Sequence, residues 1–262
     1  MADLWNAIWM GIIEGLTEFL PVSSTGHLIL LGELLHFTGD RAKTFEVVVQ
    51  FGAVLAVLVL YRRRFASLLN FNFKQTSRLN ALHVLLAMVP AGIMGVGLHG
   101  VIKHYLFSPA TVLIGLLAGG VLMIGADRAG RKVTAEGLDD ITYRQAFVIG
   151  FFQVLALWPG FSRSGSTISG GMLLGTSQKA AAEFTFIVSV PMMAGASGID
   201  LLKSREFLTA ADAPLFLIGL LAAFIVGTLA CVTFINMMKK LRLSWFAYYR
   251  FGLAIIFAFI VL

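Results

Sequence analysis

Residues 143–174, YRQAFVIGFFQVLALWPGFSRSGSTISGGMLL, contain the pattern that decides the fold. An apolar arm runs into a break at Pro159-Gly160, hydroxyl-bearing residues and Arg163 follow, and a second apolar arm then begins. Neither arm has the ~20 apolar residues that a transmembrane helix needs. Broken backbone at membrane depth must be satisfied by protein, because lipid offers no hydrogen bonds. The pattern therefore predicts a re-entrant helix–turn–helix, which enters a membrane and returns on the same side.

A second stretch, residues 5–35, WNAIWMGIIEGLTEFLPVSSTGHLILLGELL, has the same organisation. At an offset of 139 positions, identical residues pair as Ala7/Ala146, Gly11/Gly150, Leu16/Leu155, Ser23/Ser162, Gly26/Gly165, Ile29/Ile168, Gly32/Gly171, Leu34/Leu173 and Leu35/Leu174. Glu14 aligns with Gln153, whereas Pro21 and Pro159 are one position out of step. Coincident glycines and serines around both breaks indicate an internal duplication.

The composition identifies the surroundings of these segments. Hydrophobic residues make up 58% of the chain and charged residues 13%, against roughly 25% charged in soluble domains. Six further stretches are apolar and long enough to span, at about 20 residues each: 44–61, 80–98, 109–127, 180–199, 214–238 and 245–262. We therefore predict an all-α polytopic membrane protein, a single integral membrane domain over residues 1–262. It has six transmembrane helices and two re-entrant segments.

The formal net charge of +6 predicts the orientation of the chain. Cytoplasmic loops collect Lys and Arg, so the excess is interpreted as a topology signal and not as a sign of nucleic-acid binding. The residues assigned to the cytoplasm are Arg62, Arg63, Arg64, Lys74, Arg78, Arg128, Arg131, Lys132, Lys179, Lys239, Lys240 and Arg242, and the outer loops hold Arg41, Lys43, Lys103, Lys203 and Arg205.

The single Cys231 excludes an intrachain disulfide and a cysteine-based metal site.

This orientation makes the two copies inverted. Span 44–61 runs inward, so the first re-entrant segment enters from outside and the second enters from the cytoplasm. Three spans, an odd number, separate the copies, and the inverted halves are about 1–127 and 139–262. Inverted repeats meet near the midplane and build a binding site there. Both termini are expected on the outer side.

Two glutamates lie in the first re-entrant arm. Glu14 and Glu18 are four residues apart, hence on one face of a helix. An ionisable residue at membrane depth is costly and is a functional candidate, the simpler alternative being an ion pair that serves packing. Two carboxylates one turn apart repel unless a cation or a shared proton lies between them. The pair therefore suits Mg²⁺ or Ca²⁺, or one carboxyl acts as a general acid or base.

The two breaks carry the other candidate residues. The first, PVSSTGH, places Ser23, Ser24, Thr25 and His27 at the start of a helix, where free N–H groups bind phosphate. Ser23 and Thr25 are predicted phosphate-binding residues. Ser24 or Ser23 is a candidate nucleophile if His27 takes its proton. The alternative is that these hydroxyls only cap the helix.

In the second break Arg163 lies among hydroxyls: Ser162, Ser164 and Thr167. Its planar guanidinium matches phosphate oxygens, and these four residues are predicted to hold phosphate. If the inverted copies meet, Arg163 faces the group formed by Glu14, Glu18 and His27. A structural Arg–Glu ion pair is the alternative for this arginine.

These motifs resemble a known family. Glu14-Gly-Leu-Thr-Glu18 matches (Glu/Gln)-x-x-x-Glu, and residues 159–167, PGFSRSGST, match Pro-Gly-x-Ser-Arg-Ser-x-x-Thr. With PVSSTGH, TFEVVVQFG, GLDDITYRQAF and SVPMM, they make nearly the whole chain similar to the undecaprenyl-diphosphate phosphatases of bacterial inner membranes, the bacitracin-resistance type. The residues to which the resemblance points are Glu14, Glu18, Ser24, His27, Ser162, Arg163 and Thr167.

The resemblance implies hydrolysis of an isoprenyl diphosphate lipid, undecaprenyl diphosphate, to the monophosphate carrier lipid and inorganic phosphate, in support of cell-wall synthesis. It also implies a divalent metal and an active site that opens to the periplasm. The nucleophile stays open between Ser24, Ser23 and water, and so does the existence of a homodimer. The alternative function is a cation- or proton-coupled transporter or lipid flippase, because inverted repeats with broken helices also build transporters.

Overall fold

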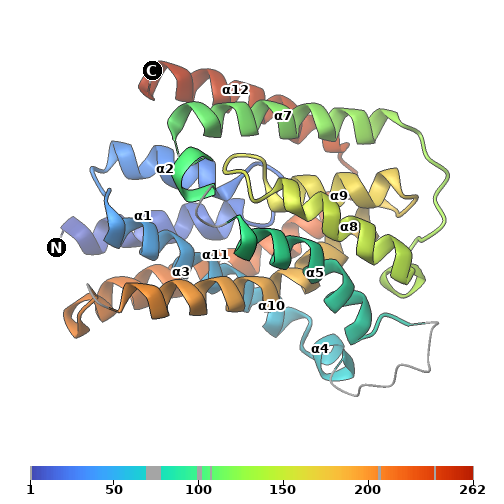
Figure 1. The fold of residues 1–262 in the computed structure, drawn as a ribbon, viewed down its shortest axis with the longest axis horizontal. Helices are drawn as coiled ribbons and strands as arrows, with labels where there is room; N and C mark the ends of the chain where they lie inside the picture. Colours follow the sequence, from blue (N-terminus) through green and yellow to red (C-terminus); the bar gives the residue numbers. More distant parts are fainter. Residues whose placement is uncertain are drawn as a thin grey trace.

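The computed structural model describes residues 2–68, 78–98, 102–106, 108–205, 208–238 and 240–261. Long helices lie side by side in this part of the chain (Figure 1). The elements are α1 (Ala2–Thr17), α2 (Ser24–Leu34), α3 (Asp40–Leu60), α4 (Arg62–Leu68), α5 (Ala81–Gly97), η1 (Ile102–Leu106), α7 (Pro109–Arg128), η2 (Leu138–Asp140), α8 (Tyr143–Leu155), α9 (Arg163–Leu173), α10 (Gln178–Ser204), η3 (Ala210–Asp212), α11 (Ala213–Met237) and α12 (Leu243–Val261). Over the described ranges the fold is all-helical, with one isolated bridge between Ala135 and Thr176.

Four helical stretches are long and apolar enough to cross a membrane: Asp40–Leu60, Ala110–Arg128, Gln178–Ser204 and Ala210–Met237. They coincide with four of the six predicted spans, and a multi-pass membrane protein is thereby confirmed. The other two predicted spans, 80–98 and 245–262, contain the shorter apolar helices Ala81–Gly97 and Leu243–Phe259. Of the basic residues used for the orientation, Lys74 and Lys239 lie outside the described residues.

Two helix–turn–helix units form where the repeated stretches lie. The first joins α1, which ends at Thr17, to α2, and the second joins α8 to α9, which begins at Arg163. None of these four helices is among the candidate spans. In Figure 1 the first unit extends from the left end of the bundle and the second from the right, with their turns toward the middle. The chain thus brings the two breaks from opposite ends of the bundle to its centre.

Helix α1 packs closely against α11 because both carry glycine at the contact. A Cβ atom added to Gly11 would lie 2.4 Å from the carbonyl oxygen of Gly219. The contact between α8 and α5 is similar, since a Cβ atom on Gly150 would lie 2.6 Å from the carbonyl oxygen of Ala87. Small residues let membrane helices approach to backbone contact. The first contact fixes the arm that carries the two glutamates.

The substitution Gly11→Ala is expected to lower the thermal unfolding midpoint of the purified protein in detergent. Its methyl group has no room beside Gly219, and overpacking of this kind costs roughly 1–3 kcal/mol. Gly92→Ala is the matched control, since nothing lies within 4 Å of the added carbon and alanine favours a helix over glycine. Equal midpoints for the two variants would contradict this packing.

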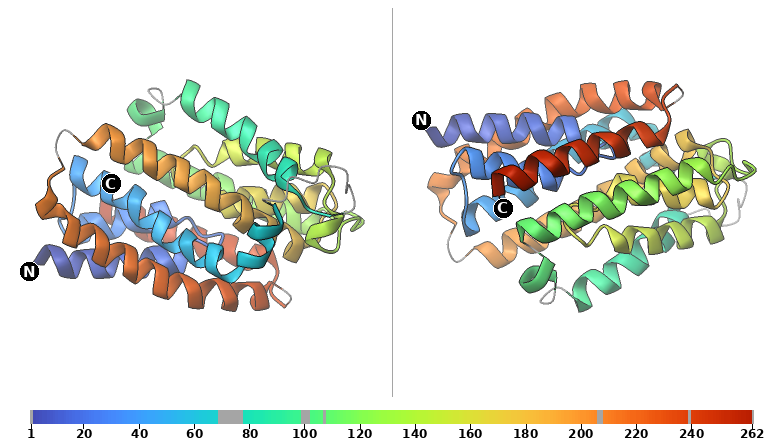
Figure 2. Two further views of the ribbon diagram at one scale, coloured as in Figure 1. Left: turned by 90° about the horizontal axis from the view of Figure 1, so that it is seen from below. Right: turned by 90° about the horizontal axis from the view of Figure 1, so that it is seen from above.

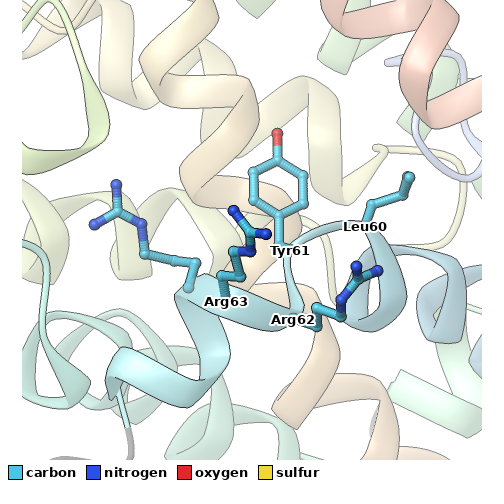
Figure 3. Close-up of a pocket in the computed structure, with 5 residues that line it drawn as sticks. Leu60, Tyr61, Arg62 and Arg63 are labelled. Carbon is cyan, nitrogen blue, oxygen red and sulfur yellow. The ribbon is translucent and has the colours of Figure 1, made fainter.

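A pocket of about 440 Å³ lies at the junction of α3 and α4 and contains none of the predicted site residues (Figure 3). Its lining residues are Leu60, Tyr61, Arg62, Arg63 and Arg64. Arg64 donates hydrogen bonds to both carboxylate oxygens of Asp139, at 2.7 and 3.1 Å. Partial burial acts to raise the pKa of Asp139, but hydrogen bonds from Arg64 and from the Leu79 amide hold it below its usual value. Arg64 therefore ties the loop before α8 to α4.

Candidate functional site

The helices α2 and α9 begin in the same unusual way. Ser23 and Ser162 precede them with φ angles of 72° and 74°, in a region that non-glycine residues seldom adopt. Each hydroxyl accepts a hydrogen bond from the amide three residues ahead, that of Gly26 at 3.3 Å and that of Gly165 at 3.1 Å. Both serines are thus N-caps, and strained backbone at matching positions is typical of a functional site.

The two turns meet through a buried ion pair between Glu18 and Arg163. Arg163 Nη2 lies 2.6 Å from Glu18 Oε1, and the side chains are 11% and 6% exposed. Close by, the Ser164 hydroxyl donates to the carbonyl oxygen of Leu20 at 3.0 Å. Arg163 therefore faces the glutamate arm of the first copy, in the arrangement expected if the inverted copies meet. The ion pair considered as the alternative is present too, and the two interpretations are compatible.

Ser24 contacts Glu18 and not His27. The Ser24 hydroxyl donates to Glu18 Oε2 at 2.6 Å. His27 binds the carbonyl oxygen of Ser23 through Nδ1 at 2.8 Å and the Tyr249 hydroxyl through Nε2 at 2.8 Å. The structure does not show the pairing of Ser24 with His27 considered from the sequence, because both ring nitrogens of His27 have other partners; a catalytic role for His27 stays a prediction. The carboxylate in contact with the candidate nucleophile Ser24 is therefore that of Glu18.

Three buried polar atoms at this meeting point have no hydrogen-bond partner among the described residues: both carboxylate oxygens of Glu14, and Arg163 Nη1. Glu14 is 0% exposed and lies within electrostatic range of Glu18, Arg163 and Glu46. A buried polar group left unsatisfied costs roughly 1–3 kcal/mol, and more when it is charged. Two carboxylate oxygens and a guanidinium nitrogen in this state suit a ligand that combines a cation with an anion.

The remaining predicted phosphate contacts lie around the same turns. Thr167 is buried, donates to the carbonyl oxygen of Arg163 at 2.7 Å and accepts from the Thr185 hydroxyl at 2.8 Å. The hydroxyls of Ser162 and Ser164 lie 3.2 Å apart. Thr25 is partly exposed in the first turn of α2. Thr167 thus holds the backbone of Arg163 in place, and its contact with phosphate stays a prediction.

Two successive residues of α12, which the sequence analysis did not single out, complete the site. Tyr249 contacts His27, as described above. Arg250 is 0% exposed and donates through Nη2 to the carbonyl oxygens of Gly160, at 2.6 Å, and Gly115, at 3.1 Å. It therefore fastens the turn that precedes Arg163 to α7. The sequence did contain a signal for Arg250, because an arginine inside a predicted transmembrane span is a functional candidate.

Glu14 and Glu18 are the residues that fit a divalent cation. The described residues contain no group of three or more His, Cys, Asp or Glu side chains able to hold a metal ion, so the pair is not a closed metal site. Mg²⁺, however, is commonly bound by one or two carboxylates together with substrate phosphates. The two unpartnered oxygens of Glu14 are hard ligands of this kind, whereas both oxygens of Glu18 already accept hydrogen bonds from Ser24 and Arg163. Glu14 is therefore the carboxylate open to a cation, and a shared role for Glu18 stays a prediction.

Comparison with known proteins assigns the family. Residues 7–256 match the family model described as bacitracin resistance protein BacA. The chain is 53% identical over 264 residues to proteins named undecaprenyl-diphosphatase 1 from Bacillus cereus (strain ZK / E33L) and Bacillus anthracis, and the alignments cover 100% of each chain. The matched residues include both turns and the two residues of α12. The chain therefore belongs to the bacitracin resistance protein BacA family.

Proposed function

We propose that the chain is an undecaprenyl-diphosphatase, which hydrolyses undecaprenyl diphosphate to undecaprenyl phosphate and inorganic phosphate and so recycles the carrier lipid for cell-wall synthesis. The observation that carries this function is the buried contact of Ser24 and Arg163 with the two oxygens of Glu18. A nucleophile, a base and a phosphate-binding group thereby meet at one carboxylate. The relatives at 53% identity are named for this activity. A transporter needs no hydroxyl poised on a carboxylate.

Arg163 holds the diphosphate in this proposal. Its Nη2 stays on Glu18, and its unpartnered Nη1 donates to a phosphate oxygen. Helices α2 and α9 both begin at the site, and their N-termini add favourable dipoles for an anion. Donors fixed in advance stabilise the charge that develops during phosphoryl transfer.

Ser24 is the proposed nucleophile. Its Oγ forms a bond to the terminal phosphorus, the bond from that phosphorus to the bridging oxygen breaks, and undecaprenyl phosphate leaves. Glu18 Oε2, 2.6 Å from the hydroxyl oxygen, accepts the serine proton, and water then hydrolyses the phosphoserine. Trapping a ³²P-labelled phosphoserine from labelled substrate tests this route. Reproducible failure to trap it with active protein favours direct attack by water.

We further propose that Glu14 and Glu18 hold a divalent cation, Mg²⁺ or Ca²⁺, which neutralises charge on the diphosphate when bound. Phosphate release should then stop after treatment with EDTA and return when Mg²⁺ or Ca²⁺ is added. Glu14→Gln should raise the metal concentration for half-maximal rate by roughly tenfold or more, since even outer-shell partners change metal affinity ~10–100-fold. Glu136→Gln, at an exposed loop residue, is the control. Full activity in EDTA would exclude this metal role.

The finer topology is also a proposal: six transmembrane helices and two re-entrant segments, in inverted halves 1–127 and 139–262. It is supported by equivalent packing under the 139-residue offset, since α1 packs on α11 as α8 packs on α5. The start of α1 and the end of α12 lie at the same end of the bundle, and α7 runs beside α12 (Figures 1 and 2). With the basic loops in the cytoplasm, both termini and the opening of the site face the periplasm across the inner membrane.

The deciding experiment for the function is phosphate release by purified protein in detergent, with undecaprenyl diphosphate and no membrane gradient. An enzyme turns over under these conditions, whereas a transporter or flippase releases no phosphate. Gradient-driven transport in liposomes, without any phosphate release, would establish a transporter or flippase instead.

A further inference from the structure

Both ring nitrogens of His27 are held, and the two partners differ in kind. The partner of Nδ1 is the carbonyl oxygen of Ser23 at 2.8 Å. A carbonyl oxygen only accepts hydrogen bonds, so Nδ1 carries a hydrogen and donates it. In the neutral ring Nε2 then has the lone pair. The group that faces this lone pair is the Tyr249 hydroxyl at 2.8 Å, and Nε2 is the nitrogen at which His27 can gain or lose a proton.

Tyr249 reaches His27 from the opposite end of the sequence. It lies on α12, 222 positions beyond His27, and the two rings are nearly parallel, with an interplanar angle of 6° and centroids 5.7 Å apart. Arg250, the next residue, is 0% exposed and holds the turn before Arg163 through the Gly160 carbonyl. Helix α12 therefore contacts both turns of the site, the first through Tyr249 and the second through Arg250.

We propose that Tyr249 is a positioning residue for the hydrolysis, acting through Nε2 of His27; this inference rests on the proposed phosphatase activity. The tyrosine hydroxyl donates a hydrogen bond to Nε2 while the imidazole is neutral. A hydroxyl can also accept a hydrogen bond, so the contact persists if Nε2 is protonated by water. Tyr249 thus keeps His27 in one orientation through both protonation states, while Ser23 fixes the other nitrogen. Phenylalanine keeps the ring but loses this hydroxyl.

The first test is Tyr249→Phe, assayed by phosphate release in detergent with undecaprenyl diphosphate. We expect kcat to fall roughly tenfold, a part of the ~10²–10⁴-fold that His27 would contribute as a general acid or base. KM should stay nearly unchanged if Tyr249 acts only through His27. The matched control is Tyr248→Phe, which makes the same change one residue away. The Tyr248 ring packs on Trp245, and its variant should keep the wild-type kcat. A wild-type kcat for Tyr249→Phe would overturn the proposal.

A double-mutant cycle separates this role from a structural one. If Tyr249 acts through His27, Tyr249→Phe has no further effect on kcat in a His27→Gln background, because coupled residues are not additive. The same tenfold loss in both backgrounds would show that the tyrosine acts elsewhere, and would overturn the inference.

A second measurement does not depend on turnover. In protein labelled with ¹⁵N-histidine, the His27 resonances are identified by their absence from His27→Gln. Tyr249→Phe should shift the Nε2 resonance and leave Nδ1 nearly unchanged, whereas Tyr248→Phe shifts neither. An Nε2 resonance that is the same in Tyr249→Phe and wild type contradicts the contact itself. Wild-type protein that releases no phosphate while this shift is present contradicts only the proposed function.

Discussion

Replacing Arg163 by alanine is expected to lower the rate of phosphate release by roughly 10²–10³-fold, the loss typical for removal of one fixed donor to a developing charge. In the structure this guanidinium joins the two halves of the site, with Nη2 on Glu18 at 2.6 Å and Nη1 buried without a partner. The alanine variant removes both the proposed phosphate contact and the charge that balances the Glu18 carboxylate. Initial rates in detergent, with substrate at saturation and below KM, measure the effect.

Two further variants make this result interpretable. Removing one member of a buried ion pair destabilises a protein by about 3–5 kcal/mol, so thermal unfolding of Arg163→Ala must be measured beside its activity. Arg163→Lys keeps the charge but not the planar fork and should recover stability better than rate. Arg131→Ala, at an exposed loop residue, should match wild type. A folded Arg163→Ala protein that retains more than about a tenth of the rate contradicts the phosphate-binding role.

The second large effect is expected for Glu18→Gln, which keeps the size of the side chain and removes its charge. In the wild type the Ser24 hydroxyl donates a hydrogen bond to Glu18 Oε2 at 2.6 Å. A glutamine amide cannot take up the serine proton as a base, and it has no negative charge to balance that of Arg163. Loss of a general base typically lowers a rate by ~10²–10⁴-fold, so kcat should fall within this range. Single-turnover assays should also show no labelled phosphoserine. Glu33→Gln, at an exposed residue of α2, serves as the control for a lost carboxylate.

The rate losses caused by Glu18→Gln and by Arg163→Ala should not be additive in free energy. Glu18 and Arg163 contact each other, so they act as a unit, and removing a second member of a unit costs little more than removing the first. The double variant of Glu18→Gln with Arg163→Ala is therefore expected near the rate of the slower single variant. Multiplied losses would indicate that the two residues serve separate steps.

The helices were predictable because their signals are local. Apolar length identified four spans that the structure also finds, and the breaks at PVSSTGH and PGFSRSGST marked both helix–turn–helix units. Charge at membrane depth was sufficient to identify Glu14, Glu18 and Arg163, since burying such groups is expensive without a purpose.

Hydrogen-bond partners within the site were not predictable in the same way. Spacing places Ser24 and His27 one turn apart, which made a serine–histidine pair plausible. The backbone carbonyl of Ser23 and the hydroxyl of Tyr249 take the imidazole instead. Neither partner can be predicted from the local sequence. The contact with the Ser23 carbonyl depends on the left-handed backbone at Ser23, and the contact with the Tyr249 hydroxyl depends on how α12 packs. Arg250 was visible as a charge in an apolar run, but its carbonyl partners were not.

The position of α12 in the chain has a consequence for biosynthesis. It is the last helix, Leu243–Val261, and it supplies the hydroxyl on His27 and the guanidinium on the turn before Arg163. Proteins are made from the N-terminus, and earlier segments fold first. We therefore expect these two contacts to form only after α12 has joined the helices made before it. A nascent chain stalled before Leu243 already has both glutamates and Arg163 but lacks both contacts, and we expect it to release less phosphate than a chain that includes α12.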